Sequence, residues 1–223
     1  MSNTTIHYVT FDSPEKVLIR ESEFENQEYV YSKCPVHTHK QNRVFVGLSP
    51  IDFSLRVTRK TGEMNHIVCD DPNLITWDDE HVMSPKPVIQ LKIPKWLFWT
   101  NEDDVWFDFY DHPMTALNNN FVAVPGWFNL SNWSRGCSLA LTIVNESKPV
   151  IIKKGDPLFR VAFHPPNLND GIMLAQEKDP QKIDFIYEEY DKKMKEGQAD
   201  KRWKPKLFSE TGKSKCPFSF LFK

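Results

Sequence analysis

The sequence has few glycines, no dominant charge and no long apolar run, and each shortage excludes a class of protein. Eight glycines among 223 residues form no glycine-rich loop of the kind that cradles phosphates. The formal net charge of −2 creates no field that would attract nucleic acid or an anionic membrane. A membrane-spanning helix needs about eighteen or more consecutive apolar residues, and no stretch of the sequence approaches that length. We therefore expect a soluble protein that binds neither nucleic acid nor membrane.

Cysteine motifs and a signal peptide are also missing. The four cysteines are Cys34, Cys69, Cys137 and Cys216, and no two of them form a C-x-x-C pair. This spacing argues against a zinc ribbon or a thioredoxin-like motif. The N-terminal "MSNTTIHYVTFDSPEKV" has no basic stretch followed by an apolar run, as a signal peptide would have. We expect free thiols in a cytoplasmic protein.

Aromatic residues, by contrast, are abundant. They make up 13% of the chain, with seven Trp and sixteen Phe, which can fill a sizeable core. Short alternating segments separated by Pro, Gly and Asn predict strands. These segments cover residues 5–12, 43–48, 52–59, 66–69, 73–77, 87–100, 105–110, 121–130 and 138–145. Residues 13–29 fit a helix or a strand, and Pro94 predicts an edge, a bulge or a break in its strand.

The spacing of the strands predicts a mainly β fold over residues 1–167, in the form of a sandwich or jelly roll. Residues 168–223 are predicted to form a C-terminal helix and tail. The helix starts at Asp179 and Pro180 and ends at Gly197. Its apolar positions at helical spacing are Ile183, Ile186, Tyr187, Tyr190 and Met194. The tail ends in "CPFSFLF", which we expect to dock on the domain, on a protein partner or on another copy of the chain.

The segment "VNESKPVIIKKGDPLFRVAF", residues 144–163, predicts a hairpin with a lysine-rich turn. Gly155 permits the positive φ that such a turn needs, and Asp156 can hydrogen-bond to its own backbone. We interpret the turn as a structural link between a strand that ends one sheet and a strand that enters the core. Phosphate binding is the alternative.

The aromatic residues also supply the first candidate site. Alternation in "VWFDFY" places Trp106, Asp108 and Tyr110 on one face of a strand, and Phe107 with Phe109 on the other. One face should enter the core, and the other offers an aromatic surface for a sugar, a nucleobase or a protein. The candidate ligand-binding residues are Trp106, Asp111, His112, Trp127, Asn129, Trp133 and Arg135.

A divalent metal site is the second candidate. His37 and His39 share one face if they lie on a strand, as a His-x-His site requires. A third ligand would come from His112, His164 or Asp111. Asp111 and His112 could instead pair as a carboxylate–imidazole unit that tunes a base near neutral pH. The structural alternatives are two surface histidines and a turn that ends the strand.

Residues 121–163 resemble the core of the dUTPase and dCTP deaminase superfamily. The residues at corresponding places are Pro125, Gly126, Gly136, Asn145, Gly155 and Asp156. The resemblance implies a β-barrel that hydrolyses a nucleotide. However, the family's water-activating Asp falls at Asn129, and an amide cannot act as a general base as a carboxylate does. A degenerate nucleotide binder is therefore implied as well as a hydrolase.

The whole chain resembles an uncharacterised family of bacterial and phage proteins of about this length. The matching segments are "YSKCPVHTHKQN", "VPGWFNL", "KKGDPLFRVAF" and "YEEYDKKMKEGQADKRW". This resemblance implies a β architecture, and the host cytoplasm if the protein is phage-encoded. We expect a non-enzymatic binding or assembly module. A His-x-His metal-dependent enzyme and a dUTPase-like nucleotide hydrolase or binder are the alternatives.

Overall fold

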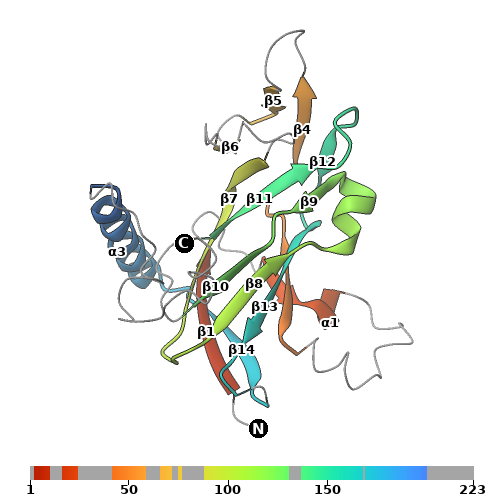
Figure 1. Ribbon diagram of the computed structural model, residues 1–223. Helices are drawn as coiled ribbons and strands as arrows, with labels where there is room; N and C mark the ends of the chain where they lie inside the picture. The colour runs from red at the N-terminus through yellow and green to blue at the C-terminus, as the bar shows by residue number, and fades with distance from the viewer. Residues whose placement is uncertain are drawn as a thin grey trace, which may run out of the picture.

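The computed structural model describes residues 3–10, 17–24, 42–58, 66–71, 75–76, 88–130, 137–167 and 169–199. Within these ranges the chain is mainly β, with helix α3 (Pro180–Ala199) at the C-terminal side (Figure 1). The mainly β class and the C-terminal helix are therefore confirmed. Neither Cys69 nor Cys137 forms a disulfide, as predicted, and both side chains are buried. None of the described helices is long and apolar enough to cross a lipid bilayer.

The strands follow the sequence prediction closely, with two differences: residues 121–130, predicted as one strand, form two strands in different sheets, and one strand is added. They are β1 (Asn3–Thr10), β2 (Leu18–Arg20), β3 (Val44–Leu48), β4 (Phe53–Thr58), β5 (His66–Cys69), β6 (Ile75–Thr76), β7 (Val88–Trp99), β8 (Trp106–Tyr110), β9 (Phe121–Ala123), β10 (Gly126–Asn129), β11 (Cys137–Ile143), β12 (Val150–Ile152), β13 (Pro157–His164) and β14 (Gly171–Gln176). Two further elements are helix α1 (Glu21–Phe24) and a π-helical turn at Thr115–Asn119. The segment left open at 13–29 contains both a strand and a short helix. Strand β14 was not predicted.

The described strands form three sheets. The six-stranded sheet has the order β14-β1-β7-β11-β9, with β6 also paired to β7. The five-stranded sheet has the order β10-β8-β13-β3-β2, and the three-stranded sheet has the order β12-β4-β5. These strands do not close into a barrel. The barrel implied by the dUTPase resemblance is therefore not observed in the described part of the chain.

The six- and five-stranded sheets share one aromatic core. Trp96 of β7 lies edge-on to Phe159 of β13, with ring centroids 4.7 Å apart. Phe98 of β7 packs against Phe163 of β13 at 5.4 Å and against Phe107 of β8 at 5.7 Å. Edge-to-face aromatic pairs contribute about 0.5–1.5 kcal/mol beyond the area they bury. This packing makes the two sheets the layers of a sandwich, as the strand spacing predicted.

Pro94 lies within β7, in the interior of the six-stranded sheet. The pairing of β7 with β11 shifts register between Ser138 and Ala140, which face Lys95 and Gln90. Gln90 pairs with β6, whereas the stretch from Trp96 onward pairs with β1. Proline has no N–H to donate to a ladder, so it fits where the strand changes neighbours. The predicted irregularity at Pro94 is therefore confirmed as a register shift.

The hairpin predicted at residues 144–163 is wrong, because its two strands join different sheets. Strand β12 pairs with β4, whereas β13 pairs with β3 and β8. The turn between them has the predicted chemistry. Gly155 has φ of 89°, and Asp156 Oδ2 accepts the Lys153 N–H at 2.9 Å. The turn therefore carries the chain from the three-stranded sheet to the five-stranded sheet. It does not join two paired strands, as a hairpin turn would.

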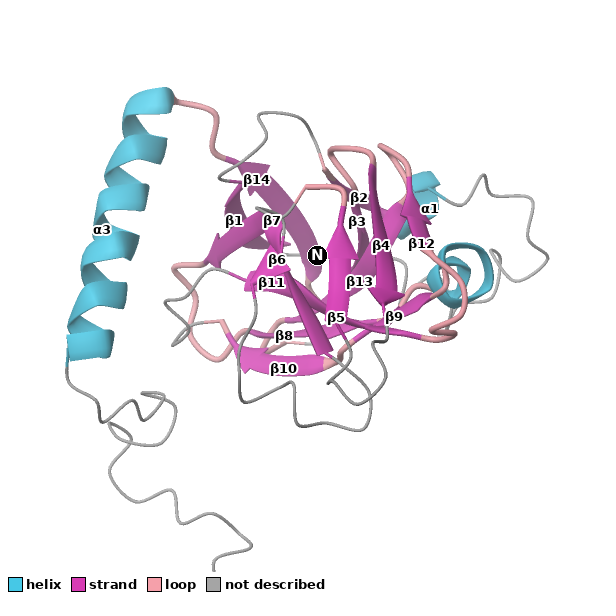
Figure 2. Cartoon of the chain, turned by 90° about the horizontal axis from the view of Figure 1, so that it is seen from above, coloured by secondary structure: helices cyan, strands magenta, loops and turns pink. Residues whose placement is uncertain are grey.

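Helix α3 starts at the predicted residue. Asp179 Oδ1 accepts the Gln181 N–H at 3.0 Å, which caps the helix N-terminus. The helix continues to Ala199, past the predicted stop at Gly197. Both views place α3 to one side of the sheets (Figures 1 and 2). Its exposed rings include Phe185, which is 64% exposed.

Candidate functional site

Strand β8 separates a core face from an outer face, as the alternation of its residues predicted. Phe107 and Phe109 are buried in the aromatic core. Trp106, Asp108 and Tyr110 alternate with them and are only partly buried. The outer face of the five-stranded sheet therefore carries the polar and aromatic side chains that sequence analysis nominated.

At one end of this face, four side chains form a tryptophan corner, which we define as Trp106, Asp108, Trp127 and His164. The Trp106 and Trp127 rings are nearly perpendicular, at 83°, with centroids 6.1 Å apart. The His164 ring lies 6.2 Å from Trp127. Trp127 is 71% exposed, so a large part of its indole faces solvent. The corner therefore presents an open aromatic surface with polar atoms beside it.

Cross-strand pairing and one side-chain hydrogen bond fix the corner in place. Trp127 pairs with Asp108, and Trp106 pairs with His164 across the ladders of β8. The Trp106 Nε1–H donates to Asp104 Oδ1 at 2.8 Å. Beneath the corner, Phe128 stacks on the buried Phe107 at 5.1 Å. The indoles thus stand on a sheet whose opposite face is packed core.

The polar part of the corner is a carboxylate–imidazole pair. His164 Nε2 lies 2.7 Å from Asp108 Oδ1, and both side chains are partly exposed, at 40% and 35%. A carboxylate accepts hydrogen bonds, and an imidazole can donate or accept depending on its tautomer. None of the four described side chains that define the corner is a lysine or an arginine. These four side chains can therefore bind hydroxyl groups, but they offer a phosphate no permanently charged donor.

Asp111 and His112 lie beyond the other end of β8 and do not form the unit that their adjacency predicted. Asp111 Oδ1 accepts hydrogen bonds from the Thr115 hydroxyl at 2.5 Å and the Ala123 N–H at 3.0 Å. His112 Nδ1 accepts the Met114 N–H at 3.2 Å. These bonds hold the turn after β8. The carboxylate–imidazole pair observed on this sheet is Asp108 with His164.

His112 belongs to a cluster that we call the closed end, defined as Glu21, Tyr110, His112 and Arg160. Glu21 and His112 are buried, whereas Tyr110 and Arg160 are partly buried. Glu21 and Arg160 form an ion pair, and the Arg160 guanidinium lies 6.0 Å from the Tyr110 ring centroid. Burial, followed by the Arg160 charge, lowers the pKa of His112 from 6.5 to about 4. Burial, followed by the Glu21 charge, raises the pKa of Tyr110. His112 and Tyr110 are therefore neutral at physiological pH.

Several predicted site residues cannot be placed in either cluster. His37, His39, Trp133 and Arg135 lie outside the described residues, as does the apolar C-terminal tail. Asn129 is buried at the end of β10, opposite Trp106 in the ladder. Within the described ranges, no three His, Cys, Asp or Glu side chains are arranged to hold a metal ion. The His37–His39 metal site therefore stays a prediction.

Sequence reasoning missed the partnership of Asp108 with His164. The residues lie 56 positions apart, and only the pairing of β8 with β13 brings them together. Alternation showed that Asp108 would face outward, but no local signal identified its partner.

Comparison of the chain with models of known protein families and with curated proteins found no match.

Proposed function

We propose that this protein is a binding module that holds a hydroxylated ring, such as a sugar unit, at the tryptophan corner. The observation that carries the proposal is the Trp127 indole, which is 71% exposed yet stands on a fixed sheet beside Trp106. Burying a large apolar side chain stabilises a fold by about 1.5–3 kcal/mol, and Trp127 leaves much of that gain unused. A ligand that covers the indole would recover part of it.

The chemistry around the indole favours a sugar over a nucleotide. One face of a sugar ring exposes C–H groups that pack on an indole, and its hydroxyls need polar partners nearby. Asp108 can accept two such hydroxyls, and His164 can donate or accept. A nucleotide phosphate would lie beside the Asp108 carboxylate without a lysine or arginine of the corner to neutralise it. The proposed ligand is therefore uncharged.

A panel of immobilised oligosaccharides, followed by titration of the intrinsic tryptophan fluorescence, tests the proposal. Trp127→Ala should weaken binding about tenfold or more, since aromatic stacking on a ring contributes roughly 1–3 kcal/mol. Phe185→Ala is the matched control, because it removes an exposed ring from α3. That variant should bind as the wild type does.

Two results would contradict the proposal. Equal binding by Trp127→Ala and the wild type would place the ligand elsewhere. The second result is that the wild type binds nucleotides but no oligosaccharide, and that only Trp127→Ala loses this nucleotide binding. The ligand at the corner would then be a nucleobase instead of a sugar.

A further inference from the structure

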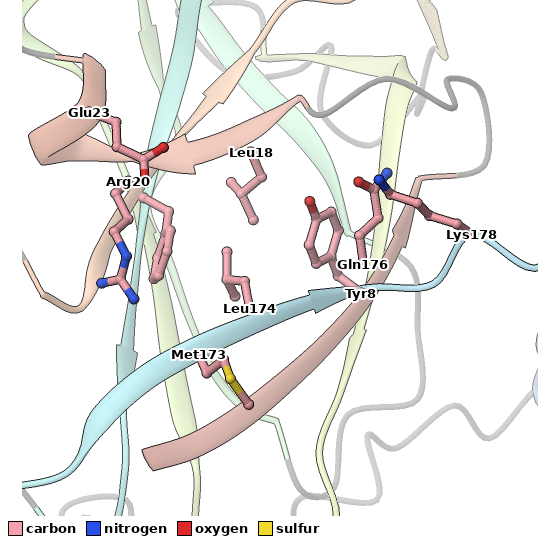
Figure 3. A pocket seen from close by; sticks show the side chains of 9 residues that line it. Tyr8, Leu18, Arg20, Glu23, Met173, Leu174, Gln176 and Lys178 are labelled. Atoms are coloured by element: carbon pink, nitrogen blue, oxygen red, sulfur yellow. The ribbon is translucent and has the colours of Figure 1, made fainter. Parts of the chain in front are cut away.

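A second site lies between the two layers of the sandwich, on the side where β2 and β14 are the edge strands. A pocket of ≈ 380 Å³ opens there, lined by residues of β1, β2, β3, β14 and α1. Figure 3 shows Leu18 of β2 and Leu174 of β14 facing each other across it. This volume falls within the range of about 300–1,000 Å³ that is typical of small-molecule sites. The pocket shares no residue with the tryptophan corner.

The pocket is lined by both polar and apolar side chains. Its apolar side chains include Leu18 and Phe45 of the five-stranded sheet and Tyr8 of the six-stranded sheet, which all belong to the core that the two sheets share. Leu174 packs against the same core from β14. An alkyl chain placed between Leu18 and Leu174 would contact an apolar side chain on each of two sides. Each methylene group that becomes fully buried stabilises the complex by about 0.8 kcal/mol.

The rim of the pocket has two cations, Arg20 and Lys178. Arg20 donates hydrogen bonds to the backbone oxygens of Ile172 at 2.7 Å and Asn42 at 3.1 Å. Within the described part of the chain, neither Arg20 nor Lys178 forms an ion pair. The adjacent Glu177 lies 3.8 Å from Lys182 instead. With Glu23 as the only carboxylate among the described lining residues, the rim carries a net positive charge.

Tyr8 adds a neutral donor to the pocket. Burial raises the pKa of its hydroxyl to about 12, so the proton stays on the oxygen at physiological pH. The described residues include no hydrogen-bond partner for this hydroxyl. The described lining of the pocket therefore combines apolar side chains, one hydroxyl donor and a rim with a net positive charge.

We propose that this pocket binds a small amphipathic carboxylate, with the carboxylate at Arg20 and an alkyl chain between Leu18 and Leu174. The Arg20 backbone contacts hold the guanidinium in place without neutralising it, so a carboxylate can supply the missing charge. Glu23 on the same rim disfavours ligands with several negative charges. The site acts independently of the tryptophan corner.

Isothermal titration calorimetry of the full chain with octanoate, and separately with octanol, tests the charge requirement. Octanoate should bind at one site per chain, and octanol should bind roughly tenfold more weakly, because it has the chain without the charge. Arg20→Gln should lower the octanoate affinity to that of octanol. Equal affinities for octanoate and octanol in the wild type would overturn the proposal.

Arg20→Gln loses a hydrogen bond between β2 and β14 and could fold poorly, so two further variants and one control complete the test. Lys178→Gln should weaken octanoate a few-fold, whereas Lys182→Gln, its matched control, should not change it. Leu174→Trp fills the pocket and should abolish binding while circular dichroism stays that of the wild type. Unchanged octanoate binding by a folded Leu174→Trp variant would place the ligand outside this pocket.

Discussion

The tryptophan corner and the closed end each include residues of β8 and β13, and they carry the same kinds of side chain. Each combines an aromatic ring with a carboxylate and a basic group. In the corner, Asp108 and His164 are partly exposed beside Trp127. At the closed end, Glu21 and Arg160 are largely buried beside Tyr110. Access to water, more than residue type, separates a candidate binding surface from a structural cluster.

Helix α1 accounts for much of this difference. It brings the Glu21 carboxylate to Arg160 and sets the Phe24 ring edge-on to His112, with centroids 5.4 Å apart. A buried ion pair gains strength from the low dielectric around it, but each charge then depends on the other. A partly exposed pair is screened by water and contributes little to stability. Three predictions test this contrast.

The largest effect is expected from Glu21→Gln, which leaves the Arg160 charge buried without its partner. Breaking a buried ion pair by removing one charge typically costs about 3–5 kcal/mol. Urea unfolding followed by circular dichroism measures the loss. The double variant Glu21→Gln, Arg160→Met should recover part of it, because no lone charge remains. A loss below about 1 kcal/mol would show that water reaches the closed end.

His112 should make the closed end sensitive to acid. Its folded pKa of about 4 lies below the ordinary 6.5, so the unfolded chain binds the proton more readily. The stability that neutral His112 provides is complete above pH 6.5 and falls as the pH approaches 4. His112→Asn, which can still accept the Met114 N–H, should flatten the slope of unfolding free energy against pH in this window. An unchanged slope would assign the acid sensitivity to other groups.

The smallest effect on stability is expected at the corner. Asp108→Asn breaks a partly exposed pair with His164 and should change the unfolding free energy by at most about 1 kcal/mol. The same change should weaken ligand binding, because the amide accepts fewer hydrogen bonds than the carboxylate. Measuring both quantities on one preparation separates the two roles. A stability loss as large as that of Glu21→Gln would make the corner a structural cluster too.

The fold was largely predictable because its strands have local signals. Alternation identified β8 and the burial of Phe107, and Asp179 marked the start of α3. Strand β14 escaped because "GIMLAQ" has neither strict alternation nor a run of β-branched residues. It is a strand because its parallel ladder with β1 supplies the missing stability.

The candidate sites were less predictable than the fold, since each depends on partners distant in sequence. Trp106 and Trp127 were nominated from local patterns, but Asp108 joins His164 only through the β8–β13 ladder. The closed end likewise unites Glu21 with Arg160 from remote segments. Adjacency of Asp111 and His112 suggested a pair that the turn geometry does not form. Local patterns identify exposed side chains, whereas tertiary pairing decides which of them meet.

The place of β1 in the six-stranded sheet has a consequence for biosynthesis. Strand β1 pairs on one side with residues 96–99 and on the other with residues 171–176, and both partners are translated after it. It therefore has no neighbour until residues 96–99 are translated, and it lacks the second until residues 171–176 follow. Such distant pairings slow folding, because a long loop must close before they form. A nascent chain truncated before Gly171 would leave one edge of β1 open to another chain, so premature termination should yield aggregates instead of a smaller folded domain.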